Sequence, residues 1–209
     1  HRHSANPALV VRHQGINWTY GELHARVNRL ATGLIHLGIK PGDRVGIWGP
    51  NSSEWVLVQL ATAKIGAIMV CINPAYRLYE LEYALNKVEC KTLITDVSFK
   101  TSDYLRMINT LAPELESSHP GQLEAEKLPH LKHVIRMGSD TTPGMYNFDV
   151  VCAAGTAEDQ ATMDALQPAL QPDDAINIQF TSGTTGNPKG ATLSHCNILN
   201  NGYLTGLAM

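Results

Sequence analysis

Short apolar segments alternate with segments of helical periodicity over residues 19–96, and this alternation restricts the fold more than any other feature of the sequence. Thr19-Tyr20-Gly21-Glu22 has the form of a capping box, and apolar residues follow it at helical spacing. Three segments have the length and composition of buried strands: 44–48, 67–72 and 92–95. Two segments between them have helical periodicity: 51–65 and 78–88. Strands joined by such helices form right-handed crossovers, so we expect an α/β protein whose βαβ units form a mostly parallel sheet.

The composition is that of a globular protein. The chain has 209 residues, of which 44% are hydrophobic and 17% are charged, and this combination argues against disorder. A formal net charge of −3 and the lack of a basic stretch argue against nucleic-acid binding. The longest stretch without a polar side chain, from about Ile65 to Ile72, is far shorter than the ~20 apolar residues of a spanning helix. We therefore expect no nucleic-acid partner and no membrane span.

Cysteine and histidine spacing predicts no metal site. The four cysteines are far apart and form no Cys-x-x-Cys pair, so they indicate neither a zinc site nor a disulfide framework: Cys71, Cys90, Cys152 and Cys196. A reduced compartment is the simplest interpretation, and no targeting segment is visible. His130 and His133 are three positions apart but have no third ligand nearby, which favours a surface pair over a metal site.

Residues 97–175 have weaker periodicity than the segment before them. Residues 104–111 are expected to be helical, and residues 133–137 are expected to form a strand. The compositions of 117–121 and 140–144 are typical of surface loops. We therefore interpret 97–175 as a variable connection between two more regular parts.

The segment Thr181-Ser182-Gly183-Thr184-Thr185-Gly186-Asn187-Pro188-Lys189-Gly190 carries the chemistry of the sequence. It follows an alternating strand at 176–180, which places Ile176, Ile178 and Phe180 on one face and Asn177 and Gln179 on the other. A short apolar segment at 191–193 comes after the motif. Its glycines allow the main chain to approach a ligand closely, and successive N–H groups in such a turn form an anion-binding nest. Four hydroxyls add donors for phosphate oxygens, and Lys189 supplies a mobile positive charge. The ligand implied is a polyphosphate.

Two other interpretations fit the residues of this loop less well. A Walker A loop does not fit, because Pro188 stands five residues after Gly183 and Lys189 is followed by Gly190. A glycine- and threonine-rich surface turn has a similar composition. The concentration of glycine, hydroxyls, proline and lysine directly after an apolar strand favours the phosphate-binding interpretation.

The loop resembles the phosphate-binding signature of the AMP-forming adenylate superfamily, which includes acyl-CoA synthetases, luciferases and the adenylation domains of peptide synthetases. Four further segments match the family in order: Thr19-Tyr20-Gly21-Glu22-Leu23, Gly42-Asp43-Arg44-Val45, Gly66-Ala67 and Asn73-Pro74-Ala75-Tyr76. Two runs are particularly similar to mitochondrial medium-chain acyl-CoA ligases: Trp48-Gly49-Pro50-Asn51-Ser52 and Ile176-Asn177-Ile178-Gln179-Phe180. The likeness covers most of the chain and is weakest between Leu115 and Pro172.

The resemblance implies a fatty-acid–CoA ligase. In that family a carboxylate attacks the α-phosphate of Mg·ATP to give an acyl-adenylate and pyrophosphate, and coenzyme A then displaces AMP. The implied cofactors are ATP and Mg²⁺, the implied partners are ATP, a medium-chain fatty acid and coenzyme A, and the implied location is mitochondrial. The resemblance assigns nucleotide binding to Thr181, Ser182, Gly183, Thr184, Thr185, Gly186, Asn187, Pro188 and Lys189. It assigns no catalytic acid or base within this chain.

The family's other nucleotide motifs do not occur in the 209 residues. These are Tyr-Gly-x-Thr-Glu, Thr-Gly-Asp and the adenylation lysine, which the family places further downstream, so the metal ligands are expected outside this chain. We therefore expect an incomplete N-terminal AMP-binding domain over 1–209 that is inactive alone. Its expected parts are a βα-repeating part, a variable connection and a phosphate-loop segment: 19–96, 97–175 and 176–209. A truncated, non-catalytic nucleotide-binding or interaction module is the alternative.

Several remaining residues are interpreted as structural. His195 follows Ser194 in an expected helix cap, and a structural role is favoured over contact with a nucleotide. Packing is favoured over an acyl pocket for four aromatic residues: Trp48, Trp55, Tyr76 and Tyr83. The strand at 176–180 is expected to have few partners and an unpaired edge beside it, because the elements that should cover it are not in the sequence.

Overall fold

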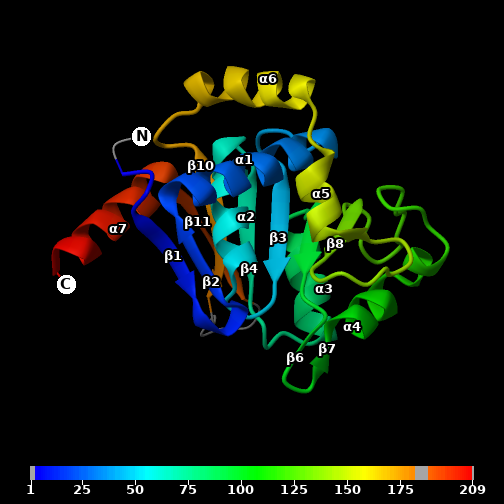
Figure 1. Cartoon of the computed structure of the whole chain (residues 1–209). Helices are drawn as coiled ribbons and strands as arrows, with labels where there is room; N and C mark the ends of the chain where they lie inside the picture. Colours follow the sequence, from blue (N-terminus) through cyan, green and yellow to red (C-terminus); the bar gives the residue numbers. More distant parts are fainter. Residues whose placement is uncertain (1–2, 182–187, 209) are drawn as a thin grey trace.

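The computed structural model describes residues 3–181 and 188–208, and a seven-stranded sheet forms the centre of this part of the chain (Figure 1). Its strand order is β11-β10-β4-β3-β5-β8-β9. The strands are β3 (Arg44–Trp48), β4 (Ile68–Ile72), β5 (Thr92–Thr95), β8 (His133–Arg136), β9 (Tyr146–Asn147), β10 (Ala175–Thr181) and β11 (Lys189–Ser194). Only β11 is antiparallel to its neighbour, so the prediction of a mostly parallel α/β sheet is confirmed.

Helices cover both faces of this sheet (Figure 1). One face packs against α1 (Tyr20–His36), α2 (Ser53–Lys64) and α5 (Phe148–Ala154), and α6 (Ala157–Leu166) packs on α1. The other face packs against α3 (Leu78–Lys87) and α4 (Tyr104–Leu111). Neighbouring strand residues point to opposite clusters, as Met69 and Val70 do, which gives strands that are apolar on both faces. Among the described helices, none is both long and apolar enough to cross a membrane.

Smaller elements complete the described chain. A hairpin before the first helix is made by β1 (Pro7–Val11) and β2 (Ile16–Thr19), and a second, shorter hairpin by β6 (Ser98–Phe99) and β7 (Ser102–Asp103). Short 3₁₀ turns cover Arg12–Gln14, Pro113–Glu116 and Gln167–Ala169. The last helix, α7 (His195–Ala208), follows β11 and has no buried residue.

The capping box predicted at the start of α1 is present. The Glu22 backbone N–H donates to Thr19 Oγ1 at 3.3 Å, and the Thr19 backbone N–H donates to Glu22 Oε2 at 2.8 Å. These contacts to Thr19 hold the pKa of the Glu22 carboxyl below its ordinary value. Two of the N–H groups that a helix start leaves without a helical partner are thereby satisfied.

The sequence interpretation of residues 176–180 needs a correction. Instead of having few partners, β10 lies between two strands, with β4 parallel on one side and β11 antiparallel on the other. The exposed edge lies one strand further out, at β11, most of whose residues are solvent-exposed. The sequence pattern predicts only a short apolar segment at 191–193, whereas these residues belong to a strand that runs back along β10.

The side chain of Asn177 connects β10 to its neighbours. The alternating pattern predicts that Asn177 lies on the polar face of the strand, yet it is fully buried. Its Nδ2 donates to Gln59 Oε1 of α2 at 2.8 Å and lies 3.5 Å from Cys71 Sγ of β4. Burial raises the pKa of the Cys71 thiol, against a smaller opposite effect of Asn177. A buried amide satisfied in this way joins β10 to both its neighbouring strand and a helix.

Candidate functional site

The loop singled out in the sequence connects β10 to β11 at the carboxyl edge of the parallel strands. Thr181 is the last residue of β10, Lys189 is the first of β11, and the two are Cα partners in the ladder. Thr181 Oγ1 donates to the Lys189 carbonyl oxygen at 3.4 Å, and both residues are exposed. Open α/β sheets bind ligands beyond the carboxyl ends of their strands, so the two residues lie where a ligand is expected.

Most of the predicted phosphate-binding residues lie outside the described part of the chain: Ser182, Gly183, Thr184, Thr185, Gly186 and Asn187. Of the predicted set, the structure describes Thr181, half-buried Pro188 and Lys189. Gly190, which ends the motif, pairs with Phe180 across the ladder. A Cβ atom at Gly190 would lie 3.0 Å from Ile178 Cγ2, so a larger residue there would press on β10. The phosphate-binding assignment stays a prediction.

A second segment that matches the family lies beside this loop. β4 is the parallel neighbour of β10, and the turn that follows it is Asn73–Tyr76. The Tyr76 ring contacts the Phe180 ring edge-on, with centroids 6.4 Å apart and planes at 63°. Phe180 directly precedes Thr181. Two motifs about a hundred positions apart in the sequence therefore meet at one edge of the sheet.

Several of the residues interpreted as structural lie in capping or packing positions. Ser194 Oγ accepts from the Asn197 backbone N–H at 3.3 Å, so Ser194 caps α7, and His195 is the first residue of that helix. Trp48 is fully buried, whereas Trp55 and Tyr76 are partly buried against the two hydrophobic clusters. Among the described residues, no group of three histidine, cysteine or acidic side chains could hold a metal ion. His130 is exposed, but His133 is buried and is not part of a surface pair.

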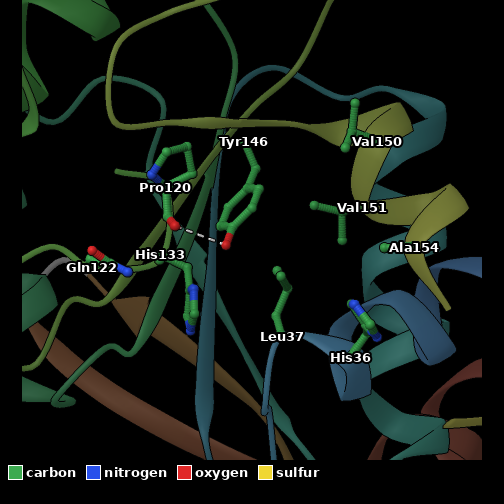
Figure 2. A pocket seen from close by; sticks show the side chains of 10 residues that line it. His36, Leu37, Pro120, Gln122, His133, Tyr146, Val150, Val151 and Ala154 are labelled. Carbon is green, nitrogen blue, oxygen red and sulfur yellow. Dashed lines mark hydrogen bonds between the residues drawn. The ribbon is translucent and has the colours of Figure 1, made fainter. Parts of the chain in front are cut away.

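A cavity of about 410 Å³ lies at the opposite end of the sheet (Figure 2). His133 begins β8, which places the cavity at the amino ends of the parallel strands, away from Thr181 and Lys189. Figure 2 shows the ring of Tyr146 near His133 on one side and the side chains of Leu37 and Val151 on the other. The Tyr146 hydroxyl donates to the Pro120 carbonyl oxygen at 3.0 Å. This cavity is therefore separate from the candidate phosphate site.

His133 should make the folded chain sensitive to acid. Burial, with a contribution from Lys91, lowers the pKa of His133 to about 4, although Asp43 opposes the shift. An unfolded histidine titrates near pH 6.5, so between about pH 6.5 and pH 4 the unfolded chain binds the extra proton. The free energy of unfolding should therefore be highest above that window and decrease as the pH falls through it. Urea unfolding at a series of pH values measures this decrease. If a His133→Gln variant lost the same stability over this pH range, His133 would not be its cause.

Comparisons with known proteins identify the family of this chain. A family model described as AMP-binding enzyme matches residues 1–208. A bovine (Bos taurus) protein named medium-chain acyl-CoA ligase ACSF2, mitochondrial, is 50% identical over 200 residues, which cover 95% of this chain and 32% of the relative. The chain belongs to the AMP-binding enzyme family, and it spans about a third of the length of the curated relatives it matches.

Solved structures in the same comparison are similar across the described fold. Acetoacetyl-CoA synthetase from Streptomyces lividans has a TM-score of 0.71 and 25% identity, and the match covers 89% of this chain and 27% of that chain. ATP-bound MatB from Rhodopseudomonas palustris has a TM-score of 0.65 and 28% identity, and the match covers 91% of this chain and 32% of that chain. The similarity therefore extends over most of this chain and over a smaller part of each enzyme.

Proposed function

We propose that this chain is the ATP-phosphate-binding part of an AMP-forming fatty-acid–CoA ligase. One observation carries the proposal: the Thr181–Lys189 pair closes the predicted loop at the carboxyl edge of the sheet, beside the Asn73–Tyr76 turn. An exposed hydroxyl and an exposed ammonium at that edge fit a polyphosphate. Membership of the AMP-binding family supports ATP as the nucleotide.

The role of these residues follows from the charge that the reaction moves. In the proposed reaction a fatty-acid carboxylate attacks the α-phosphate of ATP, pyrophosphate leaves, and coenzyme A then takes the acyl group. Negative charge gathers on the leaving pyrophosphate, so donors already aimed at it lower the barrier. Lys189 supplies positive charge at the base of the loop, and Thr181 supplies a hydroxyl. The ligands of Mg²⁺ are expected outside this chain, and no role is assigned here to its own carboxylates.

Substrate and location are inferred from the relatives. The bovine relative's name specifies a medium-chain acyl-CoA ligase and a mitochondrial location, and half of the aligned residues are identical. We extend both properties to this protein. Medium-chain fatty acids are thus the proposed acyl substrates, with ATP and coenzyme A as the other partners.

A hybrid ligase tests the proposal. Residues 1–208 would replace the matching third of the bovine relative, and fatty-acid-dependent ATP–pyrophosphate exchange and acyl-CoA formation would be measured with octanoate. We expect exchange that requires the fatty acid and thioester that requires coenzyme A. The 209-residue chain alone should form no thioester above a control without protein, because it lacks the family's other nucleotide motifs. A hybrid that folds but shows no exchange would contradict the proposal.

A further inference from the structure

Two buried aromatic residues hold the turn that lies beside the loop. Trp48, at the end of β3, and Tyr104, at the start of α4, are both fully buried and stack with their ring centroids 3.8 Å apart. Trp48 Nε1 donates to the Asn73 carbonyl oxygen at 3.2 Å. The Tyr104 hydroxyl donates to the Pro74 carbonyl oxygen at 2.7 Å. Two consecutive carbonyls of the turn are thus fixed by one stacked pair.

The turn itself has few polar groups left to rearrange. Asn73 Oδ1 accepts from the Ala75 backbone N–H at 2.9 Å, and the Asn73 carbonyl oxygen also accepts from the Tyr76 backbone N–H at 3.0 Å. Burial, with a smaller contribution from Asp96, raises the pKa of Tyr104 to about 12, so its hydroxyl keeps its proton at neutral pH. A network in which each member is satisfied favours a single conformation.

The turn connects the stacked pair to the loop through Tyr76. Its ring packs edge-on against Phe180, and Phe180 is followed by Thr181, the first residue of the predicted loop. Phe180 is also the ladder partner of Gly190, so it adjoins the residues that flank the predicted loop on both strands. Movement of the turn would therefore shift Phe180, and with it Thr181 and its ladder partner Lys189.

We propose that Trp48 and Tyr104 are positioning residues for Thr181 and Lys189, which flank the predicted phosphate loop, and that they act through the Asn73–Tyr76 turn. The proposal rests on the proposed function, because positioning has a catalytic effect only if the loop holds the leaving pyrophosphate. Preorganised donors lose much of their effect when they are displaced by a fraction of an ångström. Neither aromatic residue needs to touch ATP for its loss to slow the reaction.

The Tyr104→Phe variant tests this with a matched control in the same chain. It removes one hydroxyl and keeps the ring, as does Tyr146→Phe, whose hydroxyl also donates to a proline carbonyl, but at the opposite end of the sheet (Figure 2). In the hybrid ligase, Tyr104→Phe should lower kcat for pyrophosphate exchange about tenfold, with little change in KM for the fatty acid. Tyr146→Phe should leave both unchanged. Equal effects of the two variants would overturn the proposal.

Two further measurements separate positioning from general destabilisation. In the 209-residue chain, Tyr104→Phe should speed amide exchange at Tyr76 and leave the N–H groups at the opposite edge of the sheet unchanged. Trp48→Phe, which keeps a ring but removes the indole donor, should also reduce kcat. If Lys189→Ala abolishes exchange while Tyr104→Phe and Trp48→Phe do not affect it, the positioning proposal fails and the proposed function stands. If Lys189→Ala and Thr184→Ala both leave exchange unchanged, the proposed function itself fails.

Discussion

Alanine at position 189 should lower kcat for fatty-acid-dependent pyrophosphate exchange in the hybrid ligase by about 10²- to 10³-fold. The loss of one preorganised donor to a developing anion typically has an effect of this size. Lys189 begins β11 opposite Thr181 and is exposed at the carboxyl edge of the sheet, where the leaving pyrophosphate is placed in the proposed reaction. The KM for the fatty acid should change little, because the charge is needed mainly in the transition state.

The control for this substitution is Lys127→Ala. Lys127 is also exposed, and its carbonyl oxygen accepts from Asn86 Nδ2 near the end of α3, away from the loop. Both variants lose one positive charge, so a general effect of net charge would reduce exchange equally in both. Thr184→Ala, at a position outside the described residues, should act in the same direction as Lys189→Ala. Unchanged exchange in both loop variants would remove the phosphate role.

The parallel strands could be predicted because the pattern that defines them is local. Residues 44–48 and 92–95 are apolar on both faces, and the structure has strands at the same residues. The helix expected from residue 51 begins at Ser53, with Ser52 as its N-cap, a difference typical of helix ends. The capping box at Thr19 is a local sequence signature that specifies two reciprocal hydrogen bonds, and both are present.

The connection at 97–175 could not be predicted in the same way. It contains α5 and α6, which have seven and ten residues, and α6 buries only Met163. A helix with so narrow an apolar face gives little periodicity, and its position depends on contact with α1. His36 Nδ1 of α1, for example, lies 3.1 Å from Asp159 Oδ2 of α6, a pairing across more than a hundred positions that no local pattern specifies.

The candidate site could be predicted only in part, because some of its contacts depend on the order of strands in the sheet. The composition of Thr181–Gly190 indicates phosphate binding, because the chemical groups are contiguous in the chain. Its contact with Tyr76 depends on β10 pairing with β4 rather than with another strand, and strand order is not encoded in periodicity. The burial of Asn177 could not be predicted from the alternating pattern either. It follows from α2, which covers that side of β10.

We expect the largest loss of stability from a substitution at the close contact between α1 and α5. Gly33 lies near the end of α1 and is buried, and a Cβ atom there would overlap the Val151 carbonyl oxygen of α5. The same helix pair is close at a second point, where a Cβ atom at Gly155 would overlap Thr32 Oγ1. Glycine within a helix is unfavourable by about 1 kcal/mol relative to alanine, so the approach of the two backbones explains why glycine is found here.

The Gly33→Ala substitution should therefore destabilise the chain even though alanine is the better helix former. The added methyl group meets backbone rather than a flexible side chain, so α5 must move away from α1, and we expect a net loss of at least about 2 kcal/mol in the free energy of unfolding. Gly202→Ala is the matched control, because Gly202 lies in α7 with nothing within 4 Å of its added Cβ. That variant should be neutral or slightly stabilising. Urea unfolding of both variants measures the difference, and equal stability of Gly33→Ala and the parent chain would show that α5 does not pack on α1 as closely as the structure has it.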